Sequence, residues 1–339
     1  MTSSAPVRIR LITLGGTIAS VPQADGSNAV PRLSAQELVA GLGGSSELDG
    51  IEVLVSDFRQ TPSGDLTITD MVELAAFVTG LDDGQAVDGV VITQGTDTLE
   101  ETAFLLDLMV EVALPVVLTG AMRHPGKPGA DGPANLTGAL LVAASPLARS
   151  LGPVVYFAEQ VHLPRFVRKV HASSVSAFQS PQAGPIGWVT EGRVRIPLVP
   201  RARTAALPGP VRRGPLPRVA LVRVGLDSDA DLIEAVIQAD HAGLVVEGFG
   251  GGHVPASLVP VLAAAVERMP VVYASRTGAG EVYESTYGFA GSERDLLEHG
   301  LIGAGFLDGA KARLLLTLLL AAGTTQRSDI AARFAATTE

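Results

Sequence analysis

The stretch Val91-Ile-Thr-Gln-Gly-Thr-Asp-Thr-Leu-Glu-Glu-Thr-Ala103 contains the most informative residues of this chain and predicts a strand, a turn and a helix. A short apolar run passes into a polar turn, and a helical pattern follows. The turn consists of Gly95, Thr96, Asp97 and Thr98. Because the first N–H groups of a helix have no partner within the helix, this turn places hydroxyls and a carboxylate beside free backbone donors. We expect a strand that ends in a binding or catalytic corner.

A second threonine corner lies near the start of the chain, in Ile12-Thr-Leu-Gly-Gly-Thr-Ile-Ala19. Thr17 follows two glycines at the end of an expected strand and could act as a nucleophile, although a helix cap or a turn is the commoner role of such a threonine. The corner lacks the G-x-G-x-x-G pattern of dinucleotide sites and the Gly-Lys-Ser/Thr ending of a P-loop. Two such corners suggest a hydroxyl nucleophile with an acid/base partner.

Thr96 and Asp97 allow two interpretations. Asp97 could hold the ammonium group of a substrate while Thr96 positions or activates a water molecule. Alternatively, both residues cap the helix, and Glu100 and Glu101 stabilise its N-terminus through the helix dipole. The pattern of these residues alone leaves both interpretations open.

The composition limits the class of protein. The chain has 339 residues, 47% of them hydrophobic, with a formal net charge of −10 and no cysteine. The length suffices for two domains. The negative charge repels phosphates, so nucleic acids and anionic membranes are poor partners. The absence of cysteine excludes disulfides, thiolate zinc sites and cysteine nucleophiles.

No targeting or membrane segment is expected. The apolar patch over 9–20 is interrupted by Gly15, Gly16 and Thr17, which is typical of a strand and loop rather than a signal peptide. The apolar run over 314–322 is shorter than the roughly 18 residues that a membrane span needs. We therefore expect a soluble, cytoplasmic protein.

Short β-branched runs alternate with helical periods, which predicts a parallel-rich sheet flanked by helices. The larger N-terminal α/β domain should span 1–196, with expected strands over 7–14, 51–55, 89–93, 116–119 and 154–157, and helices over 35–41, 71–79, 97–112 and 134–144. In open parallel sheets ligands bind beyond the carboxyl ends of the strands. We expect the loops at 15–17, 95–97 and 119–122 to converge there on one pocket.

A second, smaller α/β domain with a parallel sheet is expected over 218–339. A Pro- and Arg-rich linker over 197–217 precedes it. The expected strands lie at 219–224, 244–247 and 271–275, and the expected helices at 229–239, 256–268 and 310–321.

A capping box of Ser34 and Glu37 should begin the first helix of the larger domain.

Two stretches, Thr13-Leu-Gly-Gly-Thr-Ile-Ala19 and Gln94-Gly-Thr-Asp-Thr-Leu-Glu-Glu101, together resemble the two signatures of the bacterial-type L-asparaginase/glutaminase family. The similarity covers nearly the whole chain. Further matching stretches follow in the family's order: Leu118-Thr-Gly-Ala-Met-Arg123, Ala130-Asp-Gly-Pro-Ala-Asn-Leu136, Arg168-Lys-Val-His171, Glu247-Gly-Phe-Gly-Gly-Gly-His-Val254 and Tyr287-Gly-Phe289.

The resemblance implies hydrolysis of the side-chain amide of L-asparagine, or of L-glutamine, to the acid and ammonia, with no metal and no cofactor. Thr17 would be the nucleophile that forms an acyl-enzyme. Thr96, hydrogen-bonded to a lysine, would help to activate water. Asp97 would bind the α-ammonium group of the substrate.

The remaining site residues also follow from the resemblance. Ser63 would bind the α-carboxylate, Gly95 would also contact the substrate, and backbone N–H groups near Thr96 and Ala121 would stabilise the oxyanion. Glu281 matches an acidic residue that reaches the site of a neighbouring subunit. The family is typically tetrameric, so we expect a homotetramer or a dimer.

Two departures from the family pattern stand out. The lid segment over 20–32 contains no tyrosine, and Val30 occupies the place of the tyrosine that usually contacts the nucleophile. The lysine partner of Thr96 is expected near 143–147, where Pro146 falls. Among the three lysines of the chain, Lys169 is the best substitute, although a solvated surface charge is its favoured interpretation.

These departures leave two functions open. The leading hypothesis is an amidohydrolase, and the alternative is a non-catalytic or weakly active amino-acid-binding protein of the same fold. Subunits of transfer-RNA amidotransferases also resemble this family, but they usually carry an added domain, and the negative charge of this chain disfavours a nucleic-acid partner.

Overall fold

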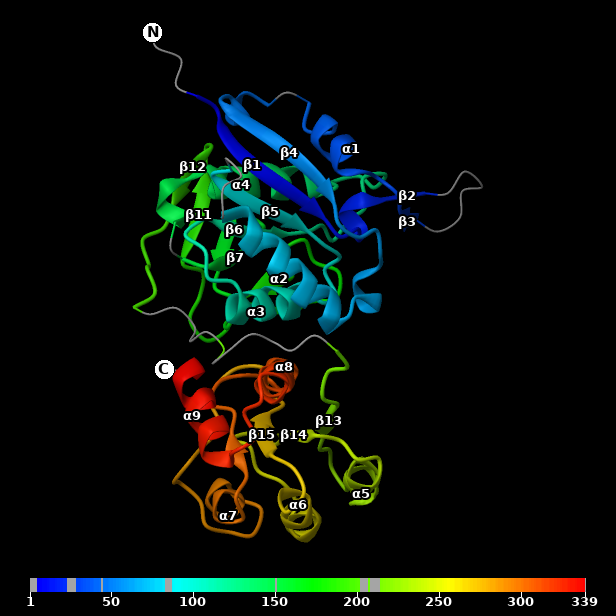
Figure 1. The fold of residues 1–339 in the computed structure, drawn as a ribbon, viewed down its shortest axis with the longest axis vertical. Helices are drawn as coiled ribbons and strands as arrows, with labels where there is room; N and C mark the ends of the chain where they lie inside the picture. Colours follow the sequence, from blue (N-terminus) through cyan, green and yellow to red (C-terminus); the bar gives the residue numbers. More distant parts are fainter. Residues whose placement is uncertain are drawn as a thin grey trace. The chain divides into compact units, whose positions relative to one another are not determined.

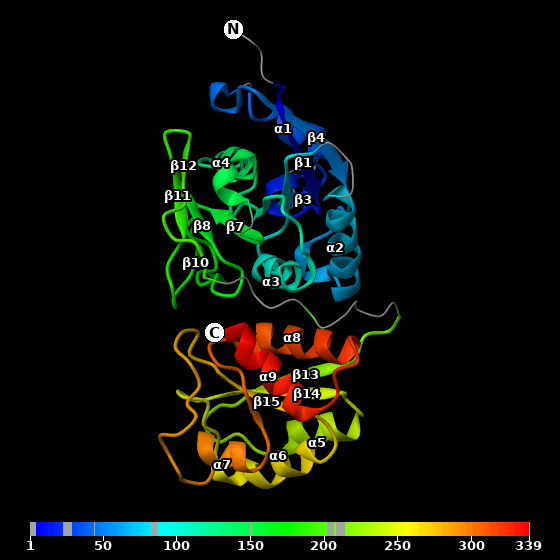
Figure 2. The ribbon, with the colours of Figure 1, turned by 60° about the vertical axis from the view of Figure 1, so that its left-hand side comes forward.

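The computed structural model describes residues 5–22, 29–43, 45–82, 87–149, 151–201, 207 and 214–338. Contacts between residues divide the chain into two units, Met1–Arg203 and Thr204–Glu339. The boundary falls inside the Pro-rich stretch over 197–217. Much of that stretch, 202–206 and 208–213, lies outside the described residues. Figures 1 and 2 show one central sheet in each unit. No helix among the described residues is long and apolar enough to cross a membrane.

The sheet of the first unit has eight strands in the order β12-β11-β8-β7-β6-β5-β1-β4. The predicted parallel strands are confirmed, and an antiparallel extension that we did not predict continues the sheet beyond β7. The parallel strands are β1 (Val7–Thr13), β4 (Ile51–Asp57), β5 (Gly89–Thr93), β6 (Val116–Thr119) and β7 (Pro153–Phe157). The extension consists of β8 (Gln160–His162), β11 (Gly187–Thr190) and β12 (Arg193–Arg195).

Helices cover both faces of this sheet, whose central strands are mostly apolar. Every residue of β5, β6 and β7 is buried, as expected for parallel strands packed on two sides. Figure 1 shows α2 and α3 in front of the sheet and α4 behind it. The helices are α1 (Ala35–Ala40), α2 (Ile68–Asp82), α3 (Leu99–Met109) and α4 (Gly132–Ala144).

Local sequence signals explain how these helices begin. The predicted capping box is present at α1, where Glu37 N–H donates to Ser34 Oγ and Ser34 N–H donates to Glu37 Oε2. The helix expected over 97–112 begins two residues later, at Leu99, because Thr96–Thr98 remain in the turn. Gly138 lets α4 approach the sheet closely, since a Cβ there would lie 2.0 Å from the Tyr156 hydroxyl.

The second unit contains a parallel sheet of four strands in the order β13-β14-β15-β16. Its strands are β13 (Val219–Arg223), β14 (Gly243–Gly248), β15 (Val271–Ser275) and β16 (Ile302–Gly303). Its helices are α5 (Asp231–Gln238), α6 (Val259–Val266), α7 (Glu293–Glu298), α8 (Gly309–Ala321) and α9 (Arg327–Thr338). The short strand β16 and the helices α7 and α9 were not predicted.

The antiparallel extension buries a histidine at its first strand. His162 is fully buried, and its Nδ1 lies 2.9 Å from Ser180 Oγ. Its Nε2 has no hydrogen-bond partner among the described residues. Burial lowers the pKa of His162 to about 4, so the imidazole is neutral in the folded protein at pH 7.

We predict that His162 makes the first unit acid-sensitive. An unfolded histidine has a pKa of about 6.5. As the pH falls below that value the unfolded chain binds a proton before the folded chain does, and the free energy of unfolding decreases by up to about 3 kcal/mol by pH 4. Denaturant unfolding at pH 7 and pH 4.5 should show a smaller loss in His162→Gln, which keeps a polar group but does not titrate. Equal losses in the two proteins would contradict this role.

Candidate active site

Thr17 lies where the chain leaves β1 and passes directly beside the end of β5. It begins a short 3-10 helix, η1 (Thr17–Ala19), after Gly15 and Gly16, whose φ angles are +96° and +86°. A Cβ on Gly16 would lie 2.1 Å from the main-chain N of Gly95. Only glycine permits both this backbone conformation and this contact. Thr17 is therefore held next to the Gly95 corner.

Ser63 joins this corner from the loop that follows β4. It begins the 3-10 helix η3 (Ser63–Asp65) and is only 4% exposed. A Cβ on Gly95 would lie 2.7 Å from Ser63 Oγ, and a Cβ on Gly15 would lie 2.7 Å from the main-chain N of Thr61. The loop that carries Ser63 thus touches the ends of both β1 and β5.

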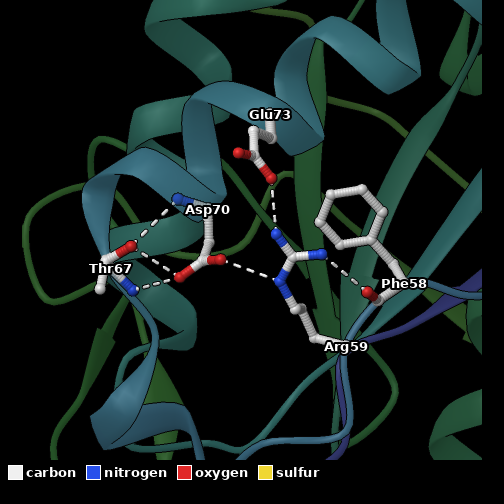
Figure 3. A network of polar contacts seen from close by, with 5 residues as sticks. All are labelled: Phe58, Arg59, Thr67, Asp70 and Glu73. Carbon is white, nitrogen blue, oxygen red and sulfur yellow. Dashed lines mark hydrogen bonds and ion pairs between the residues drawn. The ribbon is translucent and has the colours of Figure 1, made fainter. Parts of the chain in front are cut away.

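A network around Arg59 ties the two sides of the Ser63 loop together (Figure 3). Arg59 donates to Asp70 Oδ1 at 2.8 Å and to Glu73 Oε2 at 2.5 Å, and Asp70 in turn accepts from Thr67 N–H at 2.9 Å. Burial acts to raise the pKa of Asp70, but the hydrogen bonds from Thr67 and Arg59 hold it below its usual value. Because Arg59 precedes the loop and Thr67 follows it, the network restricts the position of Ser63.

The loop after β6 completes the cluster. A Cβ on Gly120 would lie 2.5 Å from the carbonyl oxygen of Gln94, and Ala121 is fully buried. Asn135 in α4 donates to the carbonyl oxygen of Gly120 at 3.0 Å. The three loops expected to converge, with Thr17, Thr96 and Ala121, therefore lie together at the carboxyl edge of the sheet.

Lys169 supplies the cation of this site. Its Nζ donates to Thr96 Oγ1 at 2.9 Å and lies 2.6 Å from Asp97 Oδ1. The Lys169 side chain is only 16% exposed, whereas that of Asp97 is 78% exposed. The favoured interpretation of Lys169 as a solvated surface charge was therefore wrong.

The expected position of the lysine near Pro146 was also wrong. Pro146 begins the 3-10 helix η4 (Pro146–Ala148), between the end of α4 and the start of β7. In a parallel sheet this connection returns to the amino ends of the strands, opposite the edge that holds the threonine corners. Lys169 instead comes from β9 (Arg168–Lys169), which pairs with β10 (Phe178–Gln179). From the sequence, Lys169 was only the best substitute among the three lysines of the chain.

Glu100 holds the backbone of Lys169. The Lys169 N–H donates to Glu100 Oε2, and Glu100 lies in the first turn of α3. This contact joins β9 to the helix that begins at the Gly95–Thr98 turn. Glu100, first interpreted through the helix dipole, therefore also fixes where the Lys169 side chain starts.

Val30 and Glu281 are not among the residues that these contacts bring together. Val30 belongs to β3 (Ala29–Pro31), which pairs with β2 (Ser20–Pro22), and β3 contacts η1. The lid residues 23–28 lie outside the described residues. Glu281 is exposed and belongs to the second unit, so it is not among the residues that the first unit brings together.

The chain matches two protein-family models. Residues 8–200 match the asparaginase N-terminal domain, and residues 218–334 match the glutaminase/asparaginase C-terminal domain. The chain belongs to the bacterial-type asparaginase/glutaminase family, as its sequence motifs indicated.

Known proteins agree with this assignment over the full length. A probable L-asparaginase of Deinococcus radiodurans is 39% identical, with 97% of each chain covered. An L-asparaginase of Bacillus licheniformis is 35% identical, over 93% of this chain and 95% of its own. The crystal structure of a probable cytoplasmic L-asparaginase from Campylobacter jejuni superposes with a TM-score of 0.86 at 29% identity, over 97% of this chain and 99% of its own.

We predict that Gly16→Ala strongly destabilises the first unit. An alanine at φ +86° is strained, and its Cβ would overlap the Gly95 backbone, which cannot rotate away. Together these effects should lower the free energy of unfolding by about 3 kcal/mol or more. The control is Gly43→Ala, where φ is +64° and no atom lies within 4 Å of the added Cβ; it should cost only about 1 kcal/mol. Equal losses in denaturant unfolding would refute the proposed importance of this contact.

Proposed function

We propose that this amidohydrolase cleaves the side-chain amide of L-asparagine through an acyl-enzyme on Thr17. The observation that carries the proposal is the hydrogen bond of 2.9 Å from Lys169 Nζ to Thr96 Oγ1, at the corner that packs against Gly16. Two-step amide hydrolysis needs a nucleophile and groups that move protons, and a hydroxyl beside a second hydroxyl paired with a cation can fill these roles. The names of the relatives, which are L-asparaginases, support asparagine as the substrate.

The first step forms an ester. Thr17 Oγ1 bonds to the amide carbon, the C–N bond breaks, and ammonia leaves with the proton that the hydroxyl gives up. Backbone N–H groups near Thr96 and Ala121 stabilise the negative oxygen of the intermediate. In the second step water attacks the ester, returns a proton to Thr17 Oγ1 and releases L-aspartate.

Thr96 and Lys169 act on the proton transfers. The Lys169 ammonium donates to Thr96 Oγ1 and so stabilises negative charge on that oxygen, which makes the Thr96 hydroxyl a better proton donor. Asp97, whose Oδ1 lies 2.6 Å from Lys169 Nζ, orients the lysine side chain.

The α-ammonium and α-carboxylate groups of the substrate bind to different side chains. The exposed carboxylate of Asp97 binds the α-ammonium, using the oxygen that Lys169 does not occupy. Ser63 binds the α-carboxylate, and Gly95 leaves room for the substrate between them. These two contacts orient the side-chain amide toward Thr17.

A binding protein without turnover is the second candidate function. Val30, at the place of the usual lid tyrosine, favours it, because valine can neither donate nor accept a proton. A missing lysine partner of Thr96 would also favour it, but Lys169 Nζ donates to Thr96 Oγ1.

We predict that the rates of ammonia release from L-asparagine and L-glutamine distinguish the roles of the proposed catalytic side chains. Thr17→Ala should lose at least about 10³-fold in kcat, because no acyl-enzyme can form. Lys169→Met should lose about 10²–10⁴-fold, since the proton transfers lose their cation. Lys127→Met, an exposed lysine outside the site, should keep wild-type activity. If the wild type is no faster than Thr17→Ala on either amide, the chain is a binding protein.

We also propose a cytoplasmic homotetramer or dimer, in which Glu281 reaches the site of a neighbouring copy. The cytoplasmic location rests on the solved relative. The assembly is supported by a patch of half-exposed aromatic side chains that follows Glu281. The patch consists of Tyr283, Tyr287 and Phe289, which are 45%, 45% and 50% exposed. Such a surface is typical of association between copies of a chain.

Sedimentation velocity tests the assembly. The double variant Tyr287→Asp, Phe289→Asp should sediment as a smaller species than the wild type, because it buries two charges in the interface. The control is Leu232→Asp, a 65% exposed apolar residue on α5 of the same unit, which should leave the assembly unchanged. A monomeric wild type, or a double variant that sediments like it, would rule out this interface.

A further inference from the structure

A chain of hydrogen bonds runs behind the site from Gln94 to Ser63. Gln94 Nε2 donates to Thr98 Oγ1 at 2.9 Å, and Thr98 Oγ1 donates to the carbonyl oxygen of Ser63 at 2.9 Å. Gln94 is fully buried, and its main-chain N–H donates to the carbonyl oxygen of Thr119 at 3.0 Å. The chain therefore begins on the rigid centre of the sheet and ends on the Ser63 loop.

The direction of these bonds is fixed by the protons available. A threonine hydroxyl has one proton, and that of Thr98 goes to Ser63. The Thr98 oxygen must then accept from the amide nitrogen of Gln94, which leaves Gln94 Oε1 buried with no hydrogen-bond partner among the described residues. With the amide reversed, Oε1 would need the Thr98 proton and Ser63 would lose it. The unpaired oxygen is the energetic cost of holding Ser63.

Thr98 does not cap its own helix with its side chain, because its hydroxyl bonds to Ser63 instead. It is the N-cap residue of α3, yet its side chain makes no capping hydrogen bond. A threonine at this position usually accepts from an N–H of the first helical turn. Here its hydroxyl instead reaches across to a loop 35 residues earlier in the chain.

Ser63 is consequently held from two sides. Its carbonyl oxygen accepts from Thr98, and also from Leu66 N–H at 3.3 Å. Its side chain packs against Gly95, where an added Cβ would lie 2.7 Å from Ser63 Oγ. With the backbone fixed by Thr98, the hydroxyl and N–H of Ser63 have one defined position at the site.

We propose that Gln94 and Thr98 are positioning residues that hold Ser63 for the α-carboxylate, and that they thereby select substrates with a free α-carboxylate. This proposal rests on the role of Ser63 under the proposed function. Their side chains bond to each other and to the Ser63 carbonyl, so we expect their effect to fall on binding of the α-carboxylate and not on the chemical step.

The test compares two ligands that differ only in that group. L-aspartate carries the α-carboxylate, and β-alanine is the same molecule without it. Calorimetric titration should show that Thr98→Val weakens L-aspartate binding about tenfold, the value of one lost hydrogen bond, while β-alanine binding changes less than twofold. Thr98→Ser should restore the affinity for L-aspartate. In ammonia release, Thr98→Val should raise KM for L-asparagine and leave kcat within about twofold.

Two further variants separate positioning from stability. Gln94→Met removes the unpaired oxygen, so it should weaken L-aspartate binding without lowering the thermal stability. Thr317→Val removes a buried hydroxyl that bonds only within α8 of the second unit, and it should leave ligand binding unchanged.

The outcomes discriminate clearly. Equal loss for L-aspartate and β-alanine, failure of Thr98→Ser to rescue, or a wild type that does not bind L-aspartate would overturn the proposal. A wild type that releases no ammonia but still shows the difference between the two ligands would overturn the proposed hydrolysis and leave the role of Gln94 and Thr98 intact.

Discussion

The contact between Gly16 and Gly95 is the constraint on which the rest of the site depends. β1 and β5 are neighbouring parallel strands, so the loops that leave their carboxyl ends must pass each other within about one strand spacing, roughly 4.8 Å. A side chain on either loop would fill that space. Two glycines leave it open, and Thr17 and Thr96 follow them directly in the two loops. Thr17 and Thr96 are held in neighbouring loops because backbone packs on backbone.

The positive charge beside the Gly95–Thr98 turn comes from a distant part of the chain. Lys169 lies 73 residues after Thr96, on a two-stranded hairpin beyond the parallel strands. The carboxylate of Glu100 fixes its backbone, and the Thr96 hydroxyl and Asp97 carboxylate receive its ammonium. One turn of chain and the first turn of its helix therefore supply these three hydrogen-bond partners of Lys169. This explains why the Gly95–Glu101 stretch is both the clearest signal in the sequence and the centre of the site.

The sequence predicted those parts of the fold that local chemistry determines. The parallel strands were predicted because each is an apolar run bounded by turn residues, and the capping box at Ser34 because both its partners lie within one turn. The strands β8, β11 and β12 were missed, since they have only three or four residues and place charged side chains such as Arg193 in the sheet. Lys169 was misjudged because its hydrogen-bond partners lie far earlier in the chain, and no local pattern around Arg168-Lys-Val-His171 reveals them.

The position of Lys169 favours hydrolysis over binding without turnover. A site that only binds an amino acid needs a carboxylate for the ammonium and a hydroxyl for the carboxylate, which Asp97 and Ser63 provide. A lysine that is 16% exposed loses much of its hydration, and it also occupies one oxygen of Asp97 that a ligand would otherwise use. Such an arrangement is unfavourable for binding alone. It becomes useful when Thr96 must stabilise a changing charge during proton transfer, and the missing lid tyrosine, represented by Val30, does not alter that requirement.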